Sequence, residues 1–110
     1  MATPQTPRMT IPTQYVLATL LAEPDRECYG AEIGVAAGLA SGTIHPILAR
    51  LEGVGWLTSR WEQVNPSAAG RPARRYYRLT PDGVSDAGAA LAAAHRTRPI
   101  FASLRPVAES

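Results

Sequence analysis

The stretch that decides the fold is "SGTIHPILARLEGVGWL", residues 41–57. Its apolar residues recur at the three- and four-residue spacing of an amphipathic helix: Ile44, Ile47, Leu48, Leu51 and Val54. The opposite face carries Gly42, His45, Pro46, Ala49 and Arg50. A helix face in plain solvent normally favours strong helix formers. A helix face of small side chains with one imidazole and one arginine fits into the major groove of B-DNA, which is roughly 12 Å wide.

The start of this helix can also reach phosphates, through the hydroxyls of Ser41 and Thr43 and the free N–H groups of the first turn. If Thr43 is the N-cap, the N–H that Pro46 lacks would have had no partner in the helix. If Ser41 is the cap, one hydrogen bond is lost and the first turn bends. Pro46 either offers an apolar edge to a thymine methyl or merely shapes the helix start.

Two helices are expected before this one. The first runs from about residue 11 to 22, with Thr10 or Thr13 as its cap, and the second from about 29 to 37, with Gly38 just after its end. A very short connection then leads into the quoted helix. Two short helices joined so tightly form a helix-turn-helix pattern.

Two segments of alternating polarity follow the quoted helix, "WLTSRWE" (56–62) and "ARRYYRL" (73–79). Period-two alternation indicates strands, and the polar, turn-rich segment between them predicts a hairpin with a long tip that carries Arg71. Three helices, a strand, a loop and a strand occur in this order in a winged helix. The expected fold class is therefore α+β, mainly α: a winged helix-turn-helix of three helices and a two-stranded wing.

A last helix is expected to begin in "LTPDGVSDAGAALAAAHR" (79–96), with Thr80 as N-cap, and to extend to about Arg98. Its apolar stripe is narrow and built mostly of small side chains, which let another helix approach closely. We therefore predict a dimerisation helix whose seam is Val84, Ala87, Gly88, Leu91, Ala94 and His95. The alternative is a helix that packs only on its own domain.

Length and composition limit the number of domains, the compartment and the class of function. The chain has 110 residues, 45% of them hydrophobic and 18% charged, as expected for one folded, soluble domain. We expect a flexible arm at 1–9, the winged helix at 10–80, the dimerisation helix at 81–98 and a tail at 99–110. No membrane span or signal peptide is expected, and the single Cys28 excludes an internal disulfide, which favours a reducing cytoplasm. No metal site, cofactor or enzyme activity is predicted, because ligand clusters, phosphate loops and nucleophile–base pairs are missing.

The basic residues are eleven arginines and no lysine. Residues 41–78 hold six arginines and two glutamates, a local charge of +4. Arginine suits two-pronged contacts to phosphate and guanine. At the hairpin, Arg71 is expected to contact DNA rather than lie in a solvated tip. Arg74 and Arg75 are expected to point to opposite faces, so at most one of them faces the duplex directly, while the other is solvated or pairs with Glu62 across the hairpin. Arg50 is expected to contact a phosphate, or else to be a surface charge near Glu52.

The segments "YGAEI" (29–33), "GLASGTIHPILARLEGVGWLTSRWE" (38–62) and "GRPARRYYRLTPDG" (70–83) together resemble the PadR family of winged-helix transcriptional regulators. The resemblance runs from about Val16 to Ala94. One departure is His45, where the family usually has a tyrosine, so no tyrosine hydroxyl is available at that position. The other is the short C-terminal part, which resembles the branch without a large C-terminal domain.

The resemblance implies a homodimer that binds an inverted repeat of double-stranded DNA, usually as a repressor, with the first and last helices at the dimer contact. It implies that Ser41, Thr43, His45 and Pro46 enter the major groove. It further implies that Arg71, Arg74 and Arg75 follow the backbone or the minor groove, and that Tyr29 and Gly30 lie near a phosphate. With Gly42 and Arg50 from the outer helix face, these residues are the expected DNA-binding surface.

The sequence is also compatible with two other functions. The modest net charge of +2 and His45 also fit a winged-helix adaptor that binds a protein and no operator. A ligand-responsive regulator would hold a small aromatic compound at the dimer seam, although that seam offers few large apolar groups and does not itself indicate an effector.

Overall fold

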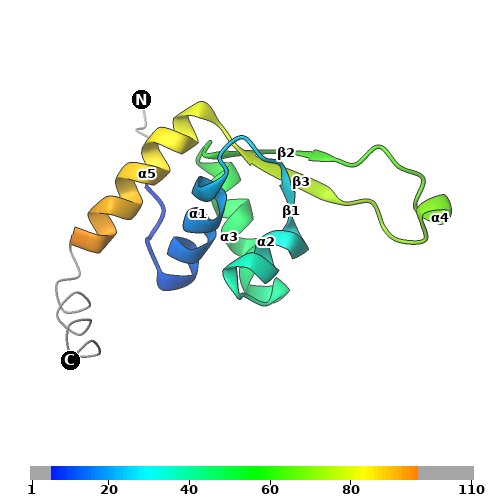
Figure 1. Ribbon diagram of the computed structural model, residues 1–110, viewed down its shortest axis with the longest axis horizontal. Coiled ribbons are helices and arrows are strands. Elements are labelled where there is room, and N and C mark those ends of the chain that lie inside the picture. The colour runs from blue at the N-terminus through cyan, green and yellow to red at the C-terminus, as the bar shows by residue number, and fades with distance from the viewer. Residues whose placement is uncertain (1–5, 97–110) are drawn as a thin grey trace.

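The computed structural model describes residues 6–96. In chain order its elements are α1 (Ile11–Ala22), β1 (Cys28–Tyr29), α2 (Gly30–Ala37), α3 (Ser41–Gly53), β2 (Leu57–Trp61), α4 (Pro66–Ala69), β3 (Arg75–Leu79) and α5 (Pro81–Arg96). Figure 1 shows α1, α2 and α3 gathered together, with the β2–β3 hairpin extending away from them as a long arm and α4 at its tip. The arrangement is a winged helix, as the element order predicts.

The predicted helix caps at Thr10, Gly38 and Thr80 are confirmed. The Thr10 hydroxyl accepts a hydrogen bond from the backbone N–H of Thr13 at 3.3 Å, and that of Thr80 accepts from the N–H of Gly83 at 2.9 Å. Gly38 ends α2 in the left-handed conformation, with φ 73°, which glycine adopts without steric cost. Local chemistry thus sets these three helix ends.

The start of α3 differs from both sequence alternatives. The N-cap is Ala40, whose carbonyl accepts from the N–H groups of Thr43 and Ile44, each at 3.0 Å. An extended backbone at Ala40 lets the first turn begin before any side-chain cap, so neither Ser41 nor Thr43 serves as one. Pro46 consequently lies inside the helix, and the hydrogen bond that its N–H would have given to the Gly42 carbonyl is missing.

Two elements were not predicted from the sequence. No strand was expected before α2, but β1 pairs with β3 through Cys28↔Tyr77 and Tyr29↔Tyr76, giving a three-stranded antiparallel sheet of order β1-β3-β2. The hairpin tip contains the helical turn α4, which Asn65 caps by accepting from the Ser67 N–H at 2.9 Å. The wing itself remains two-stranded.

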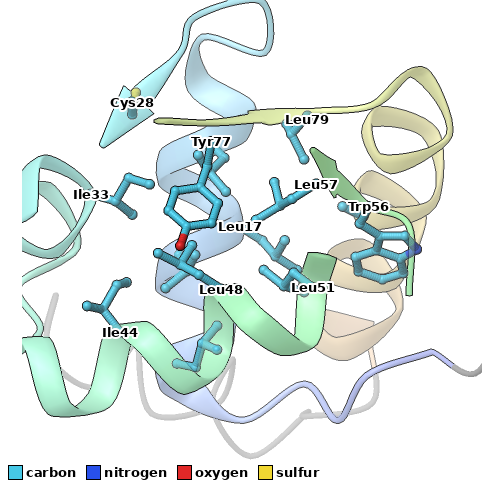
Figure 2. Close-up of a cluster of buried hydrophobic side chains, with 14 residues drawn as sticks. Leu17, Cys28, Ile33, Ile44, Leu48, Leu51, Trp56, Leu57, Tyr77 and Leu79 are labelled. Atoms are coloured by element: carbon cyan, nitrogen blue, oxygen red, sulfur yellow. The ribbon is translucent and has the colours of Figure 1, made fainter. Parts of the chain in front are cut away.

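A single core joins the helices to the sheet. Figure 2 shows Leu17 of α1, Ile33 of α2, Leu48 of α3 and Tyr77 of β3 converging from different elements. The apolar stripe read from the sequence of α3 is buried at Ile44, Ile47, Leu48 and Leu51, while Val54 is partly buried. The apolar face of α3 is therefore buried in the core, and the opposite face of the helix points away from it.

The described part of the expected flexible arm is not loose. Pro7 is buried, Met9 packs against the core, and the Met9 carbonyl accepts a hydrogen bond from the Gln14 side chain at 2.8 Å. Residues 1–5 lie outside the described residues. So do 97–110, which include the expected end of the last helix at Arg98 and the expected tail at 99–110.

Helix α5 packs against α1 and β3. Ala87 is fully buried inside the monomer, which corrects its placement in the dimer seam: a residue with no accessible surface cannot touch a partner. Gly83 lies against the backbone of Trp56, where an added Cβ would meet the Trp56 carbonyl oxygen at 2.1 Å. Of the predicted seam, Val84 and His95 are exposed, and Gly88, Leu91 and Ala94 are partly buried.

Candidate nucleic-acid interface

The outer face of α3 is open to solvent along its length. Every residue of that face is exposed: Ser41, Gly42, Thr43, His45, Pro46, Ala49 and Arg50. The residues between them on the helix are buried. The structure thus brings the seven small, polar or basic side chains of α3 into one accessible surface.

This surface continues onto the start of α2 through His45. A Cβ built on Gly30 would lie 3.0 Å from Cε1 and 3.6 Å from Nδ1 of His45. The imidazole therefore packs closely over Gly30, and any larger residue there would push it aside. Tyr29 precedes Gly30 at the N-cap of α2, where its backbone N–H donates to Glu32 at 3.3 Å. His45, Gly30 and Tyr29, predicted separately, lie together.

Arginines and tyrosines stack on the outer face of the sheet. The Arg74 guanidinium carbon lies 4.1 Å from the centroid of the Tyr29 ring. The Tyr29 ring in turn meets Tyr76 edge-on, with ring centroids 5.8 Å apart. Arg60 lies over the Tyr76 ring at 5.1 Å and donates two hydrogen bonds to Glu27, at 2.7 and 2.9 Å. Aromatic faces attract cations, so this stack holds its guanidinium groups in fixed places.

The opposite face of the hairpin ties the wing to α3. Arg75 donates to the Ser59 hydroxyl at 2.9 Å and to Glu52 at 3.4 Å, and that hydroxyl donates to Glu52 at 2.6 Å. Arg75 also lies 5.4 Å from the Trp61 ring centroid. Arg74 and Arg75 therefore face opposite ways, as predicted. Glu52, which lies near the C-terminal end of α3, fixes the base of the wing.

Glu62 has a different partner from the one expected. Its carboxylate accepts two hydrogen bonds from the Arg71 guanidinium, at 2.7 and 3.0 Å, and one from the backbone N–H of Arg74 at 3.2 Å. The sequence hypothesis of a Glu62 pair with the side chain of Arg74 or Arg75 is wrong. The hairpin tip folds back through α4, and this brings the side chain of Arg71, rather than that of Arg74 or Arg75, to the carboxylate.

Two arginines of the predicted surface form no ion pair within residues 6–96: Arg50 on α3 and Arg74 beside β3. The role of Glu27 in holding Arg60 was missed by sequence reasoning, because β1, which positions Glu27, was itself missed. The role of Ser59 was missed as well, although its place in the strand alternation puts it on the same face as Leu57.

The pairing of Glu62 gives a testable dependence on pH. Mainly through its hydrogen bonds from Arg71, and also through the Arg74 N–H, the pKa of Glu62 falls from 4.5 to about 2. A depressed carboxyl pKa stabilises the fold above the unfolded-state value and loses that effect as pH falls through the folded-state value. We expect Glu62→Gln to be less stable than the wild type at neutral pH, and to lose less stability between pH of about 4.5 and 2.

Thermal unfolding of both proteins across that range, followed by circular dichroism, measures the difference. Parallel stability–pH profiles for the wild type and Glu62→Gln would show that the Arg71 pair does not form in solution.

Cys28 is buried, and its burial raises the pKa of the thiol, so the thiol stays protonated and unreactive at neutral pH. Within residues 6–96, no three His, Cys, Asp or Glu side chains gather closely enough to hold a metal ion. Over the same range, no helix has the length and apolar character needed to cross a membrane.

Comparison with known proteins decides the family. The model of the PadR-like family of transcriptional regulators matches residues 18–89, more than half of the chain. The chain belongs to the PadR-like family. As a PadR-like protein it is a DNA-binding transcriptional regulator and no enzyme. A comparison with curated protein sequences finds no match.

Solved structures similar to this PadR-like chain are winged-helix regulators. AbfR in its disulfide-formed state has a TM-score of 0.62 and 25% identity, over 92% of this chain and 69% of that chain. Reduced AbfR bound to DNA has a TM-score of 0.59 and 25% identity, over 92% and 72%. PcaV of Streptomyces coelicolor, solved with its natural ligand, has a TM-score of 0.58 and 24% identity, over 97% and 79%. The last of these shows likeness of fold only.

Proposed function

We propose that this PadR-like chain is a homodimeric, sequence-specific repressor that binds an inverted repeat. One observation carries the proposal: the outer face of α3 is wholly exposed, while its inner face is buried. Apart from Ala49 and Arg50, the strong helix formers that normally suit a solvent-facing surface are replaced there by glycine, proline, histidine and hydroxyl-bearing residues. A helix with such a face fits the major groove, where donor and acceptor patterns distinguish all four base pairs.

The proposed DNA surface extends from α3 to its neighbours. On α3 it comprises Ser41, Gly42, Thr43, His45, Pro46 and Arg50. The start of α2 adds Tyr29 and Gly30, and the wing adds Arg74 and, at its tip, Arg71. Arg75 faces the other way and ties the wing to Glu52. We assign base recognition to Thr43 and His45, because helix N-terminal residues approach base edges in helix-turn-helix complexes. The arginines supply contacts to the phosphates.

The proposed dimer seam lies on α5 and α1. Val84 is 37% exposed and Tyr15 of α1 is 54% exposed, so large apolar groups remain uncovered on both helices. Gly88, Leu91 and Ala94 continue the seam along α5, with His95 at its end. A two-fold dimer places two copies of α3 about one helical turn of DNA apart, roughly 34–36 Å.

Selection of bound sites from a random duplex library tests this function. We expect one enriched palindrome whose half-sites are about 10 base pairs apart. Thr43→Val and His45→Ala are each expected to change the preferred bases at one half-site position. Each lost base contact should reduce the free-energy difference between the preferred and the wrong base pair by about 1–3 kcal/mol. A library that shows no enrichment would contradict sequence-specific binding. An enriched but asymmetric site would contradict the two-fold dimer.

A further inference from the structure

The arginines of the hairpin differ in whether a carboxylate of the same chain pairs with them. Arg60, Arg71 and Arg75 each contact a carboxylate, at 2.7, 2.7 and 3.4 Å. The side chain of Arg74 forms no salt bridge within the described residues, although its backbone N–H donates to Glu62 and its charge, weaker in effect than the Arg71 pair, helps to lower the pKa of that carboxyl. Arg71 also donates to the carbonyl of Pro72, at 3.2 Å. Arg71 is thus engaged by its own loop, while the charge of Arg74 is available.

The Tyr29 ring fixes where this free charge lies. With the guanidinium 4.1 Å from the ring centroid, the planar group packs on the ring and leaves N–H donors free to bind a second group. The ring itself is held edge-on by Tyr76, its strand partner across β1 and β3. Arg74 is therefore preorganised before any ligand arrives.

Arg74 also borders the outer face of α3. Tyr29 is followed directly by Gly30, over which His45 packs. Neighbouring residues therefore connect Arg74 to His45, by way of Tyr29 and Gly30. A duplex whose major groove receives His45 would present the sugar-phosphate strand next to that groove to Arg74.

We propose that Arg74 is the phosphate-binding arginine of the wing and that Tyr29 is its positioning residue. On this view Arg71, which the sequence alone favours for DNA contact, acts mainly through Glu62 to shape the loop. The proposal rests on the function proposed above, and it names the wing residue of that surface that binds the DNA phosphates. It also assigns the Tyr29 ring a role besides packing, which is to hold the Arg74 guanidinium in position.

The salt dependence of DNA binding tests the proposal. Each phosphate contact contributes about 0.9 to the slope of log affinity against log salt on B-DNA. We expect Arg74→Gln to lower that slope by about 0.9 per protomer, measured by fluorescence anisotropy on the selected palindrome and on a random duplex. Arg74→Lys keeps the charge and is expected to restore the slope.

Arg78→Gln is the matched control. Arg78 is an exposed residue of β3 on the same face of the sheet as Tyr76, and the substitution removes the same unit of charge. We expect it to lower the slope by clearly less than Arg74→Gln does. Equal losses in both variants would show a general charge effect and overturn the proposal, as would an unchanged slope in Arg74→Gln. A wild-type chain that binds no duplex would refute the proposed function instead.

The role of Tyr29 needs its own comparison. Tyr29→Phe keeps the ring and its contact with Arg74 and is expected to lose clearly less affinity than Tyr29→Leu, which removes the cation–π contact. In the Arg74→Gln background, Tyr29→Leu should cost almost nothing further, because the positioned group is already absent. Equal losses from Tyr29→Leu in the presence and absence of Arg74 would show that Tyr29 acts on the fold alone.

Discussion

Gly83→Ala is expected to remove a large part of the stability of the protein. The new methyl carbon would lie 2.1 Å from the carbonyl oxygen and 2.8 Å from the carbonyl carbon of Trp56. Both are backbone atoms, which cannot rotate away as a side-chain end can. Overpacking a core typically costs 1–3 kcal/mol, and a clash with fixed backbone should cost about 3 kcal/mol or more. Small domains have only about 5–15 kcal/mol of stability in total.

The loss should be large because this contact joins α5 to the rest of the domain. Thr80 caps α5 through the N–H of Gly83 and donates its own hydroxyl hydrogen to the Gly55 carbonyl at 2.7 Å. The Thr80 N–H donates to the Trp56 carbonyl at 2.9 Å. Separating Gly83 from Trp56 would break this whole set, and with it the burial of Ala87.

Urea unfolding followed by far-ultraviolet circular dichroism measures the effect, with Gly53→Ala as control. Gly53 ends α3, is exposed, and has no atom within 4 Å of an added Cβ. Alanine there is expected to leave the midpoint unchanged or raise it, since alanine is the better helix former. A wild-type midpoint for Gly83→Ala would mean that α5 does not pack on Trp56 in solution.

Ala49→Glu is expected to abolish DNA binding without harming the fold. Ala49 is exposed on the outer face of α3, and glutamate is a good helix former. A carboxylate facing the phosphates there adds a like-charge repulsion worth several kcal/mol. Each 1.4 kcal/mol is tenfold in affinity, so we expect a loss of about a hundredfold or more.

Fluorescence anisotropy on the selected palindrome, with Ala49→Gln as the matched control, separates charge from size. Glutamine has nearly the shape of glutamate without its charge, and we expect a loss of at most about tenfold, from the lower fit in the groove. Unfolding midpoints of both variants should match the wild type. Undiminished binding by Ala49→Glu would show that this face of α3 does not meet DNA.

The parts of the fold that the sequence predicted are those governed by neighbours along the chain. Helix periodicity identified the buried face of α3 at Ile44, Leu48 and Leu51, and a threonine hydroxyl identified where α1 and α5 begin. These signals need no knowledge of distant residues. They were sufficient to predict the main helices and the hairpin in the order of a winged helix, whereas the family was indicated by the resemblance of the quoted motifs.

The parts that escaped prediction depend on partners far away in the sequence. The two residues of β1 become a strand only because Tyr76 and Tyr77 lie beside them. Glu62 meets Arg71 only because α4 turns the hairpin tip back. Ala87 looked like a dimer contact because periodicity marks an apolar face without saying what covers it. In the candidate site, the sequence supplied the residues of α3, whereas the stacking of Arg74 on Tyr29 required the sheet register.

The carboxylate partners of the arginines also bear on how such a regulator would move along a chromosome. Arg26, Arg60, Arg71 and Arg75 are each neutralised from within. Attraction to arbitrary duplex comes almost entirely from unpaired positive charge. Because these four charges are already paired, we expect the protein to leave a wrong stretch of genome sooner than a chain in which the same four arginines were unpaired.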